Sequence, residues 1–301
     1  MRTTTLIQNN DSFVVKFYAM ASPCEVIIQT NDFNLASTVG KIVSNEVWRI
    51  EDKYSRYNPE SLCSRINQSK GEPISIDEET YLLLNFAEQC YQLSDGLFDI
   101  TSGILASLWS FYGKELRHQD FPSSEQVDKV RALVGWAKVT YDVKSVTLPL
   151  GMALDFGGFG KEFAVDRSIL LVKKLTDKPV LVNLGGDLAV TKSRENNQPW
   201  QVAIESLTCD MDEGQQTIIA LKQGALATSG DTKRFLTYQG IRYGHIINAK
   251  TGWPIIDAPR SITTQAPQCI QAGILATLAF LQGPKAEVFL TEQEITYWAT
   301  R

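Results

Sequence analysis

The sequence lacks several features by which whole classes of protein are recognised. No apolar run approaches the roughly 20 residues that a membrane-spanning helix needs. Only two of the 301 residues are histidines, His118 and His245, and the five cysteines form no CxxC pair. Lys and Arg are concentrated in no segment, and the formal net charge is -5. We therefore expect no membrane partner, no zinc or disulfide framework and no nucleic-acid partner.

Common catalytic motifs are also missing. The sequence contains no GxSxG, HExxH or GxxxxGK[ST] pattern, so the familiar serine-hydrolase, zinc-protease and P-loop mechanisms have no residues to carry them. The first 17 residues, MRTTTLIQNNDSFVVKF, contain no apolar export segment. We expect a cytoplasmic protein with reduced thiols.

What is present is an ordinary globular composition, 44% apolar and 21% charged. Apolar spacing near 3.6 predicts helices over residues 34–55, 77–93, 122–134, 163–174 and 272–281. Alternating or buried apolar runs predict strands over residues 13–18, 25–30, 179–184, 200–205, 217–221, 226–229, 243–247 and 295–299, with a short hairpin over 139–148. The order of these elements predicts a mixed α+β fold without a firm domain boundary.

Residues 225–252 form the most informative segment. Two short strand-like runs in this segment have Thr228, Ser229, Gly230, Asp231 and His245 in and around them. Hydroxyls and backbone amides in such a setting can cradle a phosphate, and a histidine can exchange a proton near neutral pH. A hairpin with polar turns and a structural histidine explains the same residues, and both interpretations stay open on these residues alone.

A second segment, residues 154–166, reads LDFGGFGKEFAVD and predicts a strand, a glycine-rich turn and a helix. Amides at the start of such a helix can hold a phosphate oxygen, and Lys161 adds a positive charge. The segment is not a P-loop, because Glu162 follows Lys161. An ordinary glycine turn is the alternative.

Three weaker signals accompany these segments. Gly186 and Asp187 end a buried strand, Phe98 and Asp99 place a ring beside a carboxylate, and Tyr57 lies in a polar loop. Each suits contact with a phosphate or a flat heterocycle. Each also has an ordinary explanation, because strand-end glycines are common and aromatic side chains often cover a core.

Taken in order, these segments resemble the ApbE family of FAD:protein FMN transferases. Residues 20–23, 54–57 with 64–67, and 96–99 are similar to the MGTP, FSxY with SRxN, and GxFD motifs of the family. Residues 154–166, 182–187, 227–231 and 245–252 are similar to LDxGGxxKGxAxD, VNxGGD, ATSGD and HIIDPxTG. The resemblance runs from about Met20 to Gly283.

The resemblance implies an α+β fold related to the T-fold, with mixed sheets and helices in a single compact unit of two lobes. We place the domain at residues 13–301, after a short extension of residues 1–12. The family cleaves FAD with a divalent metal, usually Mg²⁺, and attaches FMN by a phosphoester bond to a Ser or Thr of an acceptor flavoprotein, releasing AMP. FAD binding without turnover and metal-dependent FAD pyrophosphatase activity are the alternatives. The oligomeric state stays open.

Motif by motif, the resemblance implies residue roles. His245 is the candidate for assisting phosphoryl transfer. The residues expected to contact FAD are Met20, Tyr57, Leu97, Phe98, Asp99, Asp155, Lys161, Gly186, Asp187, Thr228, Ser229, Gly230 and Ile246.

The implied metal site departs from the family pattern. Its expected positions are Gly158 through its carbonyl, Gly273, Ala276 and Thr277, but Gly273 stands where the family has an aspartate. Asn248 likewise replaces the acid of HIIDP. Mg²⁺ prefers one or two carboxylates, so we expect weakened binding at a vacant position 273 and stronger binding after Gly273→Asp.

Three explanations of this departure are open. Another carboxylate, such as Asp187 or Asp231, could serve together with FAD phosphates and waters. The chain could belong to a cytoplasmic branch with a rearranged metal site, or it could bind FAD without transferring FMN. The sequence has no obvious [ST]GA[ST] motif, so we expect the acceptor to be a separate protein.

Overall fold

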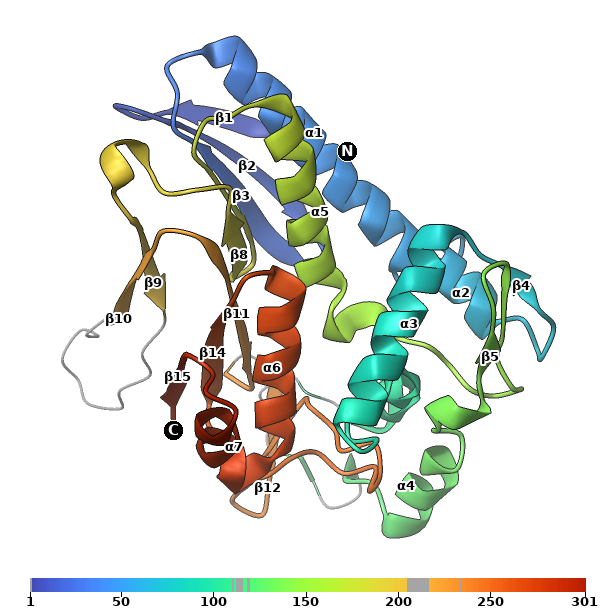
Figure 1. Ribbon diagram of the computed structural model, residues 1–301. Coiled ribbons are helices and arrows are strands. Elements are labelled where there is room, and N and C mark those ends of the chain that lie inside the picture. Colours follow the sequence, from blue (N-terminus) through green and yellow to red (C-terminus); the bar gives the residue numbers. More distant parts are fainter. Residues whose placement is uncertain (1, 110, 112–115, 118–119, 205–216, 233) are drawn as a thin grey trace.

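An antiparallel sheet of eight strands forms the centre of the fold (Figure 1). The computed structural model describes residues 2–109, 111, 116–117, 120–204, 217–232 and 234–301. His118 and Cys209 lie outside these residues. The strands, in spatial order, are β1 (Thr5–Gln8), β2 (Phe13–Ala19), β3 (Ser22–Ile28), β7 (Val180–Leu184), β8 (Asp187–Val190), β11 (Gly224–Gly230), β14 (Ser261–Ala266) and β15 (Tyr297–Thr300).

Three helices cover one face of this sheet, namely α1 (Phe33–Tyr54), α5 (Gly160–Leu175) and α6 (Cys269–Leu281). In Figure 1, α5 lies between α1 and α6. Successive side chains of a strand point to opposite faces of the sheet. In β7, Val180 and Val182 pack with the helices, whereas Leu181 is buried on the opposite face. The opposite face packs against the hairpin of β9 (Trp200–Ile204) and β10 (Thr217–Leu221).

The second lobe contains α2 (Leu62–Asn67), α3 (Glu78–Leu93), α4 (Ser124–Arg131) and a small sheet of β4 (Ile74–Ser75), β6 (Ser145–Thr147) and β5 (Thr140–Tyr141). One apolar core joins it to the main sheet, since Val26 of β3, Leu84 of α3 and Val146 of β6 belong to the same buried cluster. Helix α7 (Ala286–Glu292) lies beside α6 near the C-terminus.

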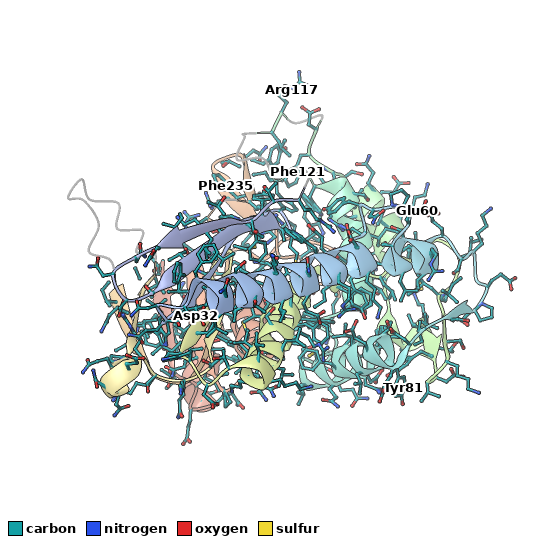
Figure 2. The ribbon with its side chains drawn as sticks, turned by 90° about the horizontal axis from the view of Figure 1, so that it is seen from above. Asp32, Glu60, Tyr81, Arg117, Phe121 and Phe235 are labelled. Carbon is teal, nitrogen blue, oxygen red and sulfur yellow. The ribbon has the colours of Figure 1, made fainter. Side chains whose placement is uncertain are left out.

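A separate hairpin, β12 (Phe235–Tyr238) and β13 (Ile241–Gly244), packs beside α4 through an aromatic cluster. The rings of Phe121 and Tyr238 are stacked at 3.9 Å between centroids. Figure 2 shows Phe121 and Phe235 on the same side of the molecule, with α1 extending from Asp32 towards Glu60. The hairpin brings the segment after Gly244 towards the main sheet.

The predicted α+β class and the five predicted helices are confirmed, with ends shifted by a few residues. The strand predicted before the glycine turn is wrong, because no strand covers residues 152–155. There the side chain of Asn67 donates to the carbonyl of Leu154 and accepts from its N–H, at 3.0 and 2.7 Å. The side-chain amide of Asn67 thus makes the hydrogen bonds with Leu154 that a neighbouring strand would otherwise make.

Two further differences concern strand bounds. The strand predicted over residues 243–247 ends at Gly244, and Ile247 makes only an isolated bridge with Pro254. Within the expected extension 1–12, residues Thr5–Gln8 pair with β2 as the edge strand. The domain start at residue 13 stays a prediction.

Candidate functional site

The site begins at the first turn of α5, where Lys161 forms an ion pair with Asp187. The Lys161 Nζ lies 2.8 Å from the Asp187 Oδ2, and the Asp187 side chain is only 3% exposed. Asp187 is placed by a two-residue turn at Gly185 and Gly186, whose φ values of 67° and 106° suit glycine in a tight hairpin. A Cβ at Gly185 would lie 2.6 Å from the Cβ of Ser22, so this turn also needs glycine for space.

Strand β11 supplies the next residues. The N–H of Thr228 donates to Asp187 Oδ1 at 3.2 Å, and the Ser229 and Thr277 hydroxyls lie 3.3 Å apart. A Cβ at Gly230 would lie 2.4 Å from the carbonyl oxygen of Arg260. The predicted Thr-Ser-Gly segment is therefore part of the main sheet, and it joins the Asp187 turn to α6.

Glu162 completes this cluster, and the sequence analysis missed it. It follows Lys161 on α5 and is only 8% exposed, and its Oε2 has no hydrogen-bond partner among the described residues. Burial, with the nearby Asp187 charge, raises the pKa of Glu162 to about 8, while Lys161 acts in the opposite direction. The available signal was Glu162 itself, which stands where the family motif LDxGGxxKGxAxD has the glycine after the lysine.

The vacancy expected at Gly273 is wrong, because Glu162 fills that space. A Cβ at Gly273 would lie 2.5 Å from Glu162 Oε1 and 2.6 Å from Glu162 Cγ. The absent side chain on α6 is thus matched by an additional buried side chain on α5. Ala276 and Thr277 lie on the next turn of α6, which packs against the 3₁₀ turn Phe156–Gly158.

His245 lies directly after β13, where its N–H donates to the carbonyl of Arg234 at 3.1 Å. The residue is half-buried, its Nδ1 has no partner among the described residues, and its ring meets Phe111 edge-on at 6.5 Å. Burial, and then the charge of Arg234, lowers the pKa of His245 to about 4. The imidazole is therefore neutral at pH 7 and able to accept a proton. The neighbouring Asp231 is paired with Arg242 at 2.9 Å.

A second group of residues lies in the loop after α1. Arg56 Nη1 lies 2.9 Å from Asp155 Oδ2, and Arg56 Nη2 donates to the hydroxyl of Tyr57 at 2.9 Å. The guanidinium also lies 5.0 Å from the centre of the Tyr57 ring. Because Tyr57 is 82% exposed, it does not cover the core, and its ring is accessible to a ligand.

The residues of the predicted GLFD motif divide between two roles. Phe98 is buried and packs on Gly158, where a Cβ would lie 3.0 Å from its ring. Asp99 is buried and accepts from the N–H and hydroxyl of Thr101 and from the N–H of Trp136, at 2.7 to 2.9 Å. These bonds give Asp99 a structural role that the sequence did not indicate, and its contact with FAD stays a prediction.

The remaining predicted residues lie at the edges of the site. Met20 is in the β2–β3 turn with a φ of 49°, and its N–H donates to Glu51 at 2.6 Å. Leu97 and Ile246 are half-buried against the main core. The structure thus brings Lys161 and Asp187 together with the segments that carry Thr228, Thr277 and His245.

Comparison with known proteins identifies the family. A sequence profile of the ApbE family matches residues 20–298. The chain belongs to the ApbE family. It is 31% identical over 251 residues to an FAD:protein FMN transferase of Haemophilus influenzae, covering 81% of this chain and 72% of that one. A Vibrio cholerae protein with the same name is 29% identical, with 81% and 73% covered.

Solved ApbE structures share the fold. The ApbE protein of Thermotoga maritima superposes with a TM-score of 0.83 at 27% identity, covering 96% of this chain and 94% of that one. The apo flavinyl transferase ApbE of Pseudomonas stutzeri gives 0.83 at 24% identity, with 100% and 92% covered. The predicted family and its fold are therefore confirmed. Among the described residues, every helix is too short or too polar to cross a bilayer.

Proposed function

We propose that this chain is an FAD:protein FMN transferase. The observation that carries the proposal is the Lys161–Asp187 pair at the start of α5, whose lysine charge also acts on the neutral His245, in an ApbE-family chain. Both curated relatives described above have this name. In the proposed reaction, a Ser or Thr hydroxyl of an acceptor flavoprotein forms a bond to the FMN phosphorus. The pyrophosphate bond to AMP breaks, and AMP leaves.

The start of α5 is the proposed site for the FAD pyrophosphate. The N-cap residue Phe159 makes no side-chain cap bond, so amides of the first turn other than that of Glu162, which bonds its own carboxyl group, are available to ligand oxygens. Lys161 adds a positive charge that Asp187 holds in one position. The β7–β8 turn at Gly186 and the Thr228, Ser229 and Gly230 segment form the proposed second wall.

The flavin and adenine rings of FAD need flat, partly apolar surfaces. We assign these to the exposed ring of Tyr57 and to Met20, Leu97 and Ile246 at the edges of the site. Asp155, fixed by Arg56, is the proposed polar contact of this region. The ring of Phe98 packs directly against Gly158.

A divalent cation, Mg²⁺ in the first instance, fits the chemistry of the cluster. The proposed ligands are the hydroxyl of Thr277 and the carbonyl of Gly158, both hard oxygen donors. When bound, the ion supplies charge neutralisation on the phosphates. The unpartnered carboxyl oxygen of Glu162 supports the presence of such an ion nearby.

His245 is the proposed proton acceptor for the attacking hydroxyl. Its lowered pKa keeps the imidazole neutral at working pH, and its Nδ1 has no partner among the described residues that would compete for the proton.

The test is incubation of the purified protein with FAD, Mg²⁺ and an acceptor flavoprotein domain, followed by mass spectrometry. Covalent FMN on the acceptor supports the proposal, and an acceptor whose target Ser or Thr is changed to Ala must stay unlabelled. Release of free FMN and AMP would instead indicate a pyrophosphatase. Intact bound FAD would indicate binding without turnover. The cytoplasmic location stays a prediction.

A further inference from the structure

The carboxyl group of Glu162 is buried between α5 and α6, where the described residues leave one of its oxygens unpaired. Glu162 is 8% exposed and its Oε2 has no hydrogen-bond partner among the described residues. A buried carboxyl group without partners destabilises a fold, and an apolar residue would fill the same space without that penalty. The position of Glu162 therefore indicates a ligand.

The packing of α5 on α6 fixes where this carboxyl group lies. Asp166 accepts from the N–H groups of Cys269 and Ile270 at 2.8 and 2.9 Å, which ties α5 to the first turn of α6. Glu162 lies one turn before Asp166 on α5, and Gly273 lies one turn after Cys269 on α6. The Glu162 carboxyl occupies the space that a Cβ at Gly273 would need. Gly158 ends the 3₁₀ turn that precedes α5, Thr277 lies on the next turn of α6, and these two elements are in contact.

The other acids near this position already have partners. Asp187 pairs with Lys161 and accepts from Thr228, and Asp231 pairs with Arg242. Asp166 is occupied by the start of α6. Among these four acids of the site, Glu162 is the one with a carboxylate oxygen left unpaired.

We infer that Glu162 supplies the protein carboxylate that binds the divalent cation, from α5, in space that Gly273 leaves open on α6. The inference rests on the proposed function for the identity of the other ligands. No cluster of three or more His, Cys, Asp or Glu side chains able to hold a metal exists in the described part of the chain. That suits Mg²⁺, which typically takes one or two carboxylates and completes its shell with waters and substrate phosphates.

The test measures Mn²⁺ binding by electron paramagnetic resonance, with and without FAD. Flavin fluorescence measures FAD binding separately, so neither readout depends on turnover. We expect wild type to bind one Mn²⁺ and Glu162→Gln to bind it at least about tenfold more weakly. The matched control is Glu46→Gln, the same change in a carboxyl group of α1 that pairs with Arg167 of α5. This variant should leave the Mn²⁺ affinity unchanged.

Reciprocal exchange provides a second, independent variant. Gly273→Asp alone should not tighten Mn²⁺ binding, because its Cβ collides with Glu162. Glu162→Gly should lose the ion, and the double variant Glu162→Gly with Gly273→Asp should restore affinity to within about threefold, because a carboxylate again occupies the shared space. Restoration also shows that loss in the single variant is not misfolding.

Two results would overturn the inference. If Glu162→Gln binds Mn²⁺ as tightly as wild type, Glu162 is not a ligand of the ion. If wild type binds FAD but no Mn²⁺, the carboxyl has no metal role although the flavin proposal stands. If wild type binds no FAD, the proposed function fails, while Mn²⁺ binding that depends on Glu162 still supports the inference.

Discussion

Two ion pairs flank the candidate site, and they are almost equal in length but different in burial. The Lys161–Asp187 pair is 2.8 Å long with side chains 31% and 3% exposed, whereas the Arg56–Asp155 pair is 2.9 Å long with side chains 29% and 27% exposed. The first contains a carboxylate that water hardly reaches. The second is open to water on both sides. Length alone therefore says little about what each pair contributes.

Burial decides the difference. An enclosed carboxylate that loses its cation remains as an uncompensated charge, whereas an exposed one is simply solvated. The pair at α5 is thus a fixed part of the fold and of the proposed phosphate site. The pair beside Tyr57 keeps both of its charged groups in partial contact with water, so its loss should cost less.

Lys161→Met should have the largest effect. Removal of the ammonium leaves Asp187 and Glu162 buried together, and we expect a loss of about 3 kcal/mol in unfolding free energy. FMN transfer should fall by at least about 100-fold, because the proposed phosphate contact is also lost. Urea denaturation and an acceptor-labelling assay measure the two effects.

Lys178→Met is the control, since Lys178 pairs with Glu195 at 3.4 Å in an exposed position and should contribute less than about 1 kcal/mol. If Lys161→Met and Lys178→Met lost the same unfolding free energy, burial would not determine what an ion pair contributes to stability.

His245→Ala should separate catalysis from binding. Without the proton acceptor, we expect transfer to fall about 100-fold, while the dissociation constant for FAD changes by less than about threefold. Single-turnover labelling and flavin fluorescence give the two numbers. A parallel loss of FAD binding would show that His245 is a binding residue.

The pKa of His245 also predicts how stability depends on pH. The folded value, about 4, lies below the ordinary value of 6.5, so the unfolded chain takes up the proton first as the pH falls. This contribution to stability is fully present above pH 6.5 and is lost towards pH 4, by about 2 kcal/mol between pH 7 and 5. His245→Asn should abolish that part of the decline in urea titrations at the two pH values. An unchanged decline would mean that the imidazole is more solvated than its position indicates.

Tyr57→Ala should have the smallest effect on the protein and a modest one on the ligand. The ring is exposed, so we expect unfolding free energy to change by less than about 0.5 kcal/mol. Stacking on a flavin or adenine ring should be lost, which weakens FAD binding by roughly 3- to 10-fold. Calorimetric titration with FAD tests this, and Leu93→Ala, another exposed apolar residue at the end of α3, is the matched control. Equal FAD affinity in wild type and Tyr57→Ala would place the ring outside the site.

Local patterns in the sequence predicted much of this arrangement. The apolar spacings of α1 and α3 each lie within a single segment, and both helices were predicted. Strand β14 was missed because its buried Thr263 and Thr264 look polar in sequence. Their hydroxyls bond to Thr228 and to the carbonyl of Ala272, partners that only the folded chain supplies.

The candidate site likewise contains residues that local motifs predicted and residues whose role depends on distant segments. Lys161, Asp187 and Thr228 lie in motifs, and the structure joins them directly. Glu162 was missed because its meaning depends on Gly273, a residue on a distant helix, and the Leu154 strand was wrong because Asn67 supplies its hydrogen bonds from another segment. Contacts between distant segments are what a single sequence does not display.

The close approach of positions 162 and 273 also limits how this chain can change over generations. A Cβ at 273 collides with the Glu162 side chain, so an acid at both positions is crowded and an acid at neither leaves the inferred ion without a protein carboxylate. A replacement at position 162 or at position 273 alone should therefore affect packing or metal binding, and we expect the two positions to change together. Among descendants and relatives, an acid at one position should accompany glycine at the other, and the exchange between the two arrangements should be rare.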